Sequence, residues 1–255
     1  MPRLNKILNI IISFWLVFIL SGVFVLVSYT KNLVAESKTV EGIDSISTDN
    51  YANNHLEYYY YIPKSIIENR YESYPLLVMV PGLSGRGEYS VTPEFKRFAE
   101  KENFIIVAPS FIWDEKNWNS QQSYQYPSVW SGDALLEIIG KLKNNNNLTV
   151  SKFYLFGFSA GAQFALRFCL WKPELCAACA AHGSGGTVIP DKNINVKFFV
   201  TVGTQDESSR IKRAKSFYDL AQDYGIDVIY REYNTGHSLT PAQIEDSLDF
   251  FRKIR

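Results

Sequence analysis

Residues 157–161 near the middle of the chain read Gly-Phe-Ser-Ala-Gly. In a G-x-S-x-G pattern the serine occupies a sharp turn between a strand and a helix, which exposes its hydroxyl for attack. The flanks fit, because the apolar segment 153–156 precedes the pattern and the helix-like segment 160–171 follows it. The start of a helix also places backbone N–H groups near a developing negative charge. We therefore predict that Ser159 is a nucleophile; a glycine–serine turn without chemistry is the alternative.

A serine hydroxyl needs a base to remove its proton, and the chain has three histidines. His237 lies in Asn-Thr-Gly-His-Ser, between the last expected strand and the last expected helix. The chain order nucleophile, acid, histidine selects His237 as the base. His182, in His-Gly-Ser-Gly-Gly, is predicted to contact substrate from a loop, and His55 is predicted to be a surface residue.

The acid that orients the base should follow a strand between Ser159 and His237. Asp206 does so, because Gly-Thr-Gln-Asp follows the apolar segment 198–202. Its carboxylate would accept the imidazole N–H, fix the tautomer and stabilise the imidazolium. Glu207 and Asp227 are the alternatives. Glu207 is expected to point elsewhere, and Asp227 begins a strand at the opposite end of the sheet.

Acyl transfer also requires N–H donors for the oxyanion of the tetrahedral intermediate. Ala160, the residue after the nucleophile, is predicted to supply one. The loop 81–85 follows the apolar segment 76–80, and Leu83 in this loop is the predicted second donor. Loss of one such donor costs about 3–4 kcal/mol of transition-state stabilisation. A serine, histidine and aspartate set needs no metal and no organic cofactor, so we expect neither.

From His55 onward, strand-like and helix-like segments alternate, which predicts an α/β fold with a mostly parallel sheet flanked by helices. The predicted strands are 56–62, 76–80, 104–108, 153–156, 177–181, 198–202 and 227–233. The predicted helices are 92–101, 131–143, 160–171, 209–224 and 241–253. The three predicted catalytic residues should then converge at one end of a single sheet.

The N-terminal region has a different character. Residues 7–29 carry no charged side chain, and a helix that spans a membrane needs about 20 apolar residues. We predict a signal anchor, a transmembrane helix within residues 1–30, then a polar stalk at 31–54 and a catalytic domain at 55–255. The predicted location is a single-pass membrane protein with the catalytic domain outside the cytoplasm. Secretion after cleavage of a signal peptide is the alternative.

The amino-acid composition indicates which classes of binding partner to expect. Lys+Arg and Asp+Glu number 26 each, and without a basic excess we expect no nucleic acid. The three cysteines are Cys169, Cys176 and Cys179, and the last two have C-x-x-C spacing, which could indicate redox or metal chemistry. No second pair or ligand cluster accompanies them, so buried core thiols are the preferred interpretation and no metal site is expected.

Aromatic side chains are concentrated between positions 111 and 130. Trp113 and Trp130 are predicted to contact the substrate, since aromatic walls suit an apolar or planar acyl group. The alternative is that these rings only pack a long loop.

Residues 55–255 resemble the compact α/β-hydrolases grouped with poly(3-hydroxybutyrate) depolymerases, feruloyl esterases and dienelactone-hydrolase-like esterases. The segments that carry the resemblance are 75–83, 154–162, 202–206 and 236–244. It implies an α/β-hydrolase fold with an eight-stranded core and ester hydrolysis through an acyl-serine. Many relatives have His-Gly in the oxyanion loop, where this chain has Pro81-Gly82.

The preferred function is therefore a serine hydrolase of carboxylic esters, acting on a small-molecule or polymer-borne ester. Two alternatives remain open. One is a serine peptidase of the prolyl-oligopeptidase kind, although no propeller-length domain precedes the hydrolase region. The other is a catalytically silent, membrane-tethered binding domain.

Overall fold

The computed structural model of the protein describes residues 38–48, 55–83, 85–111, 123–190 and 194–255. The strands are β1 (Val40–Ile46), β2 (Leu56–Ile62), β3 (Ser73–Val80), β4 (Ile105–Pro109), β5 (Thr149–Phe158), β6 (Cys176–His182), β7 (Lys197–Gly203) and β8 (Val228–Tyr233). The helices are α2 (Lys64–Glu68), α3 (Gly87–Ser90), α4 (Pro93–Glu102), α5 (Gly132–Asn146), α6 (Ala160–Trp171), α7 (Ser208–Asp223) and α8 (Pro241–Ile254), with a π-helical turn η3 (Pro127–Ser131).

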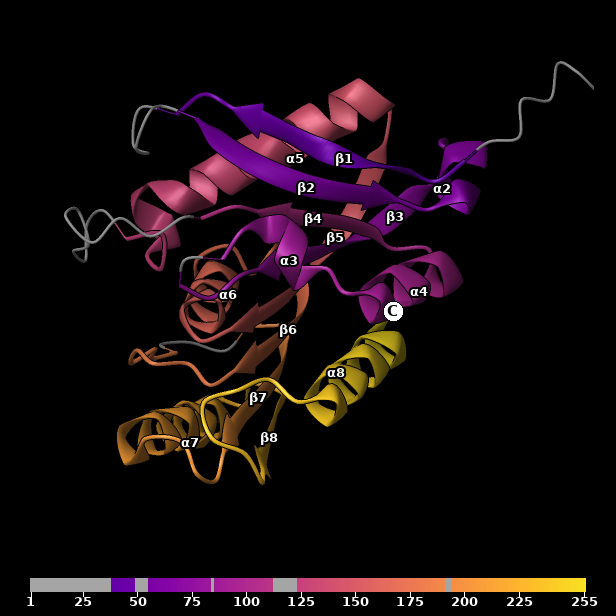
Figure 1. Ribbon diagram of the computed structural model, residues 1–255. Helices are drawn as coiled ribbons and strands as arrows, with labels where there is room; N and C mark the ends of the chain where they lie inside the picture. The colour runs from indigo at the N-terminus through magenta and orange to yellow at the C-terminus, as the bar shows by residue number, and fades with distance from the viewer. Residues whose placement is uncertain (1–37, 49–54, 84, 112–122, 191–193) are drawn as a thin grey trace, which may run out of the picture. The chain divides into compact units, whose positions relative to one another are not determined.

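The strands form one eight-stranded sheet in the order β1-β2-β4-β3-β5-β6-β7-β8. The two pairs at the β1 edge are antiparallel, and the pairs from β4 through β8 are parallel (Figure 1). The predicted mostly parallel sheet flanked by helices is thus confirmed. Every strand and helix predicted from residue 56 onward is present, with shifts of a few residues at the ends.

Alternate residues of the buried strands pack into two separate hydrophobic layers, as the period of a strand requires. On β3, Leu76 and Val78 belong to the layer covered by α5, α6 and α7, whereas Leu77 and Met79 belong to the layer covered by α4 and α8. Both faces of the central strands are therefore buried against apolar side chains. This burial fixes how far along the sheet each strand extends.

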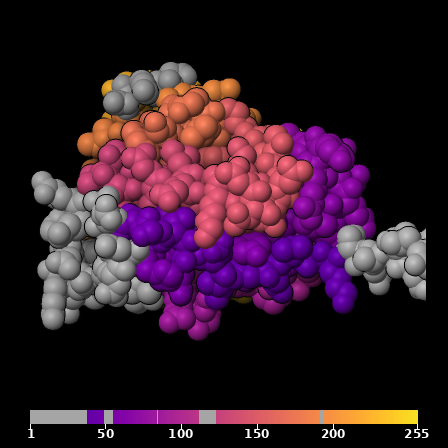
Figure 2. All heavy atoms as spheres, turned by 90° about the horizontal axis from the view of Figure 1, so that it is seen from above, coloured from indigo at the N-terminus to yellow at the C-terminus, as the bar shows by residue number. Residues whose placement is uncertain are grey.

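The polar stalk predicted at 31–54 is wrong for residues 40–46, which form β1 and pair with β2 along their whole length. Asp44 accepts a hydrogen bond from the Tyr58 hydroxyl at 3.0 Å and pairs with Lys141 of α5 at 2.7 Å. In the space-filling view the indigo β1 lies at the surface beside α5 (Figure 2). As an edge strand with one solvated side, β1 tolerates the polar residues that made this segment resemble a linker.

The predicted transmembrane helix within residues 1–30 lies outside the described residues. Within the part of the chain that the structure describes, no helix combines the length and the apolar character needed to cross a membrane.

Three loops that follow parallel strands carry the predicted catalytic residues. Ser159 follows β5, Asp206 lies three residues after the end of β7, and His237 lies four residues after the end of β8. In open α/β sheets, sites form outside the carboxyl ends of the strands. The topology therefore brings these residues to the same end of the sheet.

Candidate active site

Ser159 sits on a strained turn between β5 and α6. Its φ is 56° and its ψ is −116°, a left-handed backbone that a residue with a side chain rarely adopts. The Ser159 N–H donates to the carbonyl oxygen of His182 at 2.8 Å. A Cβ added at Gly157 would overlap the backbone of Gly161, and one added at Gly161 would overlap the carbonyl oxygen of Val80. Both glycines are thus sterically required, which explains the spacing of the motif.

The side chains of Ser159, His237 and Asp206 form a continuous series. His237 Nε2 lies 2.9 Å from Ser159 Oγ, and His237 Nδ1 lies 2.8 Å from Asp206 Oδ2. The Asp206 side chain is 1% exposed, whereas that of His237 is 32% exposed. A carboxylate acceptor requires Nδ1 to carry a proton, so in neutral His237 the Nε2 lone pair faces the serine hydroxyl. The arrangement can therefore pass the serine proton to an oriented imidazole.

Asp206 has further partners that fix its carboxylate. Asp206 Oδ1 accepts the backbone N–H of Glu207 at 2.7 Å, and Arg210 Nε lies 3.4 Å away as an ion-pair partner. The two alternative acids lie elsewhere. The Glu207 side chain is 68% exposed, and Asp227 pairs with Lys197 at 3.3 Å at the amino end of β8. Of the three acids considered, Asp206 alone reaches His237.

Backbone contacts join the loops that carry Asp206 and His237. The Thr204 N–H donates to the Tyr233 carbonyl oxygen at 2.8 Å, and the Gln205 N–H donates to the Thr235 carbonyl oxygen at 2.9 Å. The ring of Phe158 packs against the imidazole of His237, with centroids 4.8 Å apart. Acid and base are therefore held by main-chain geometry as well as by their own hydrogen bond.

The predicted oxyanion loop passes next to the nucleophile. A Cβ added at Gly82 would lie 3.7 Å from Ser159 Cβ, so the loop after β3 contacts the turn after β5. Ala160 is the first residue of α6, and the first N–H groups of a helix have no intrahelical partner. The Tyr124 hydroxyl donates to the Pro81 carbonyl oxygen at 3.0 Å and supports this loop. Tyr124 belongs to the aromatic segment 111–130, and no local sequence pattern indicates this contact.

Two predicted substrate contacts are wrong. Trp130 is only 5% exposed and packs edge-on against Phe111, within the hydrophobic core. His182 is 0% exposed, because β6 extends one residue farther than predicted and places the ring under α8 instead of in a loop. Burial lowers the pKa of His182 to about 3, so the ring is neutral at physiological pH. Trp113 lies outside the described residues.

The cysteines pack in the core. Cys169, Cys176 and Cys179 are buried thiols, which confirms the preferred interpretation that they pack in the core. Burial raises the pKa of the Cys169 thiol well above its ordinary value, so this group is a poor nucleophile. Among the residues that the structure describes, no cluster of three or more His, Cys, Asp or Glu side chains could hold a metal ion. His55 is exposed beside Glu57, in agreement with the predicted surface position.

A family model described as the dienelactone hydrolase family matches residues 77–249. This range contains Ser159, Asp206 and His237 and all strands from β4 to β8. No curated protein sequence matches the chain.

Solved structures with the same fold include three hydrolases. An S-formylglutathione hydrolase from Agrobacterium tumefaciens is 15% identical, with a TM-score of 0.65 over 85% of this chain and 95% of that one. A ferulic acid esterase from Anaeromyces mucronatus, solved with ferulic acid, is 15% identical, with a TM-score of 0.62 over 87% and 91%. A poly(3-hydroxybutyrate) depolymerase from Bordetella parapertussis is 17% identical, with a TM-score of 0.61 over 84% and 90%. At these identities the likeness establishes the α/β-hydrolase fold.

Proposed function

The chain belongs to the dienelactone hydrolase family, and from this premise we propose that it is a serine hydrolase that cleaves carboxylic esters through an acyl-serine intermediate. The observation that carries the proposal is the unbroken series from Ser159 Oγ through His237 to Asp206, with links of 2.9 and 2.8 Å. These are the distances at which a base activates a hydroxyl and an acid orients the base.

In acylation, Ser159 Oγ attacks the carbonyl carbon of the ester while His237 Nε2 takes the hydroxyl proton. Asp206 accepts the Nδ1–H of the resulting imidazolium and stabilises its charge. The tetrahedral intermediate then collapses, the bond to the alcohol oxygen breaks, and His237 returns the proton to the departing alcohol. Deacylation repeats the steps with water as the attacking group and releases the acid.

The negative oxygen of the tetrahedral intermediate is assigned to the backbone N–H groups of Ala160 and Leu83. The position of Ala160 at the first turn of α6 supports the first assignment, because helix N-termini favour negative charge. The approach of Gly82 to Ser159 supports the second. This chain has Pro81-Gly82 where many relatives have His-Gly, and this difference leaves the backbone N–H of Leu83 in place.

The family and the partial exposure of His237 support the proposed substrate class. A small-molecule ester or an ester carried on a polymer fits a catalytic histidine that is 32% exposed. The similar structures are named for S-formylglutathione, poly(3-hydroxybutyrate) and ferulic acid, and for this chain we propose a small-molecule or polymer-borne carboxylic ester.

The N-terminal segment supports a proposal on location. Residues 7–29 are uncharged and long enough to span a bilayer, so we infer a single-pass anchor with the catalytic domain outside the cytoplasm. Full-length chain should stay with membranes after an alkaline carbonate wash. Recovery of a shortened chain in the soluble fraction would instead indicate signal-peptide cleavage.

A substrate panel tests the proposed reaction. Purified full-length chain is assayed against p-nitrophenyl esters of two to eight acyl carbons and against aminoacyl p-nitroanilides, with Ser159→Ala as the matched control. We expect turnover of the esters by the wild type alone. Turnover of the anilides only would favour the peptidase alternative, and equal ester turnover by Ser159→Ala would refute the proposed nucleophile.

A further inference from the structure

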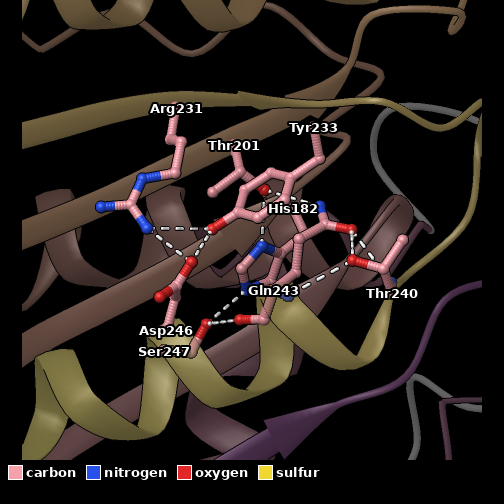
Figure 3. Close-up of polar contacts among 8 residues, drawn as sticks. All are labelled: His182, Thr201, Arg231, Tyr233, Thr240, Gln243, Asp246 and Ser247. Atoms are coloured by element: carbon pink, nitrogen blue, oxygen red, sulfur yellow. Dashed lines mark hydrogen bonds and ion pairs between the residues drawn. The ribbon is translucent and has the colours of Figure 1, made fainter.

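A buried chain of hydrogen bonds joins β6, β7 and α8 next to the catalytic loops (Figure 3). His182 Nδ1 lies 2.7 Å from the hydroxyl of Thr201 on β7, and His182 Nε2 lies 3.0 Å from the hydroxyl of Ser247 on α8. The side-chain amide of Gln243, also on α8, donates to the Thr201 hydroxyl at 2.8 Å. All four side chains are almost completely inaccessible to solvent.

The donors and acceptors of this series of hydrogen bonds have one consistent assignment. The Ser247 hydroxyl donates to the Gln243 carbonyl oxygen at 2.6 Å, so His182 Nε2 must carry the proton that it shares with Ser247. His182 Nδ1 is then the acceptor, and the Thr201 hydroxyl donates to it. The Gln243 side-chain oxygen accepts the Thr240 N–H at 2.9 Å, at the start of α8. Each polar group is satisfied with His182 neutral.

The hydrogen-bonded side chains belong to backbone segments that lead to the three catalytic loops. The carbonyl oxygen of His182 accepts the Ser159 N–H at 2.8 Å. Thr201 lies two residues before the end of β7, and its carbonyl oxygen accepts the Gly183 N–H at 2.8 Å. Thr240 lies three residues after His237 and caps α8 together with Gln243. The buried side chains therefore connect the backbones that place the nucleophile, the acid and the base.

The surroundings leave the chain little freedom to rearrange. The imidazole of His182 packs between Phe156 and Phe199, with ring centroids 4.8 and 6.0 Å away. A polar group that loses its partner in such an apolar site cannot turn to water, so an interrupted chain has to move the backbone or stay unsatisfied. Fully satisfied buried networks of this kind specify one arrangement.

We propose that His182, Thr201 and Gln243 form a positioning network that holds the loops of Ser159, Asp206 and His237 at the separation required for proton transfer. These residues act through the catalytic side chains and do not touch substrate. The inference rests on the proposed serine hydrolase function, and it assigns a role to a histidine that the sequence had placed in the substrate pocket.

Thr201→Val tests the network, because valine matches threonine in shape and removes both the donor to His182 and the acceptor for Gln243. Thr201→Ser keeps the hydroxyl and serves as the conservative rescue. We expect Thr201→Val to lower kcat at least about tenfold, since misplacement of catalytic groups by 1 Å can cost about 100-fold. KM should be unchanged, because substrate contacts stay intact, and Thr201→Ser should restore most of kcat.

The same helix offers a control outside the network. Asp246 on α8 accepts hydrogen bonds from the Tyr233 hydroxyl and the Arg231 guanidinium, both on β8 (Figure 3). Asp246→Ala removes this link between α8 and β8 without touching the buried hydroxyls. It should keep wild-type kcat and KM.

The measurements are kcat and KM on the best ester of the panel at 25 °C, with folding checked by circular dichroism and melting temperature. If Thr201→Val fails to fold, Ser247→Ala replaces it, since this change removes the partner of His182 Nε2–H. A folded Thr201→Val or Ser247→Ala with wild-type kcat and only a lower melting temperature would overturn the inference. A wild type inactive on every ester would instead overturn the proposed function, so the two failures are distinguishable.

Discussion

The backbone N–H of Ser159 donates to the carbonyl oxygen of His182 at 2.8 Å, while the ring of this histidine bonds to Thr201 and Ser247. A residue with a side chain at φ 56° is strained by about 1–3 kcal/mol and persists only where its surroundings determine it. The bond to β6 is one such determinant, and the packing of Gly157 against Gly161 is another. The exposed hydroxyl is therefore a property of three neighbouring elements.

The space around two glycines, Gly161 in the tight turn and Gly140 in α5, predicts opposite effects of alanine substitution on stability. Gly161→Ala would force a methyl group into the Val80 carbonyl oxygen and should lower the free energy of unfolding by about 1–3 kcal/mol or more. Gly140→Ala, in α5 with no neighbouring atom in reach of the new methyl group, should raise it by about 0.4–1 kcal/mol. Urea denaturation measures both. Equally small changes in the free energy of unfolding would contradict the close approach of Gly161 to Val80.

The pairing of His237 with Asp206 predicts a large effect for a nearly isosteric change. Asp206→Asn keeps the shape but presents an amide to His237 Nδ1, which favours the wrong tautomer and should lower kcat by about 10⁴-fold. Glu207→Gln, at the exposed neighbouring position, should keep kcat within about twofold of wild type, as surface changes away from a site usually do. Steady-state ester hydrolysis gives both values. A reversed order would assign the acid to Glu207.

The backbone donor assigned to Leu83 can be removed by proline, which has no N–H. Leu83→Pro should lower kcat by about 10²–10³-fold, as loss of an oxyanion donor does, whereas Leu83→Ala keeps the N–H and should stay near wild type. Comparison of kcat between these two folded variants separates the N–H from the side chain. A similar decrease in both would assign the effect to the leucine side chain.

The buried imidazole of His182 predicts a dependence of stability on pH. Its pKa is lowered from 6.5 to about 3 by burial, so between these values the unfolded chain binds a proton that the folded protein does not. The stability of the fold with a neutral His182 is therefore fully present above pH 6.5. The free energy of unfolding decreases as pH falls from 6.5 toward 3, by up to about 1.4 kcal/mol per pH unit. Nitrogen-15 NMR of labelled histidines should show His182 neutral at pH 5. A protonated His182 in folded protein at that pH would contradict the burial.

The series of Ser159, His237 and Asp206 could be predicted from sequence because each member has a local signature. Ser159 has flanking glycines, and Asp206 and His237 each follow a segment that the sequence predicts as a strand. Parallel topology then brings these loops together without any knowledge of distant contacts. The fold was predictable for the same reason, since continuous apolar runs such as β3 and β4 indicate strands buried on both faces.

The wrong predictions concern residues whose side-chain direction or pairing depends on contacts with distant parts of the chain. His182 was placed one position beyond the end of its strand, but β6 includes it, and successive strand residues point to opposite faces. Trp130 belongs to a segment without clear period, so its burial depends on Phe111 and on other residues distant in sequence. Residues 40–46 are polar enough to resemble a linker, and only pairing with β2 makes them a strand.

Covalent labelling tests the central claim most directly. Full-length wild type and the variants Ser159→Ala and His237→Gln are treated with a fluorophosphonate, and the modified residue is located by peptide mass spectrometry. The account predicts one phosphonylated residue, Ser159, in the wild type, no labelling of Ser159→Ala and much slower labelling of His237→Gln. Labelling at another residue, or equal labelling of wild type and Ser159→Ala, would contradict it.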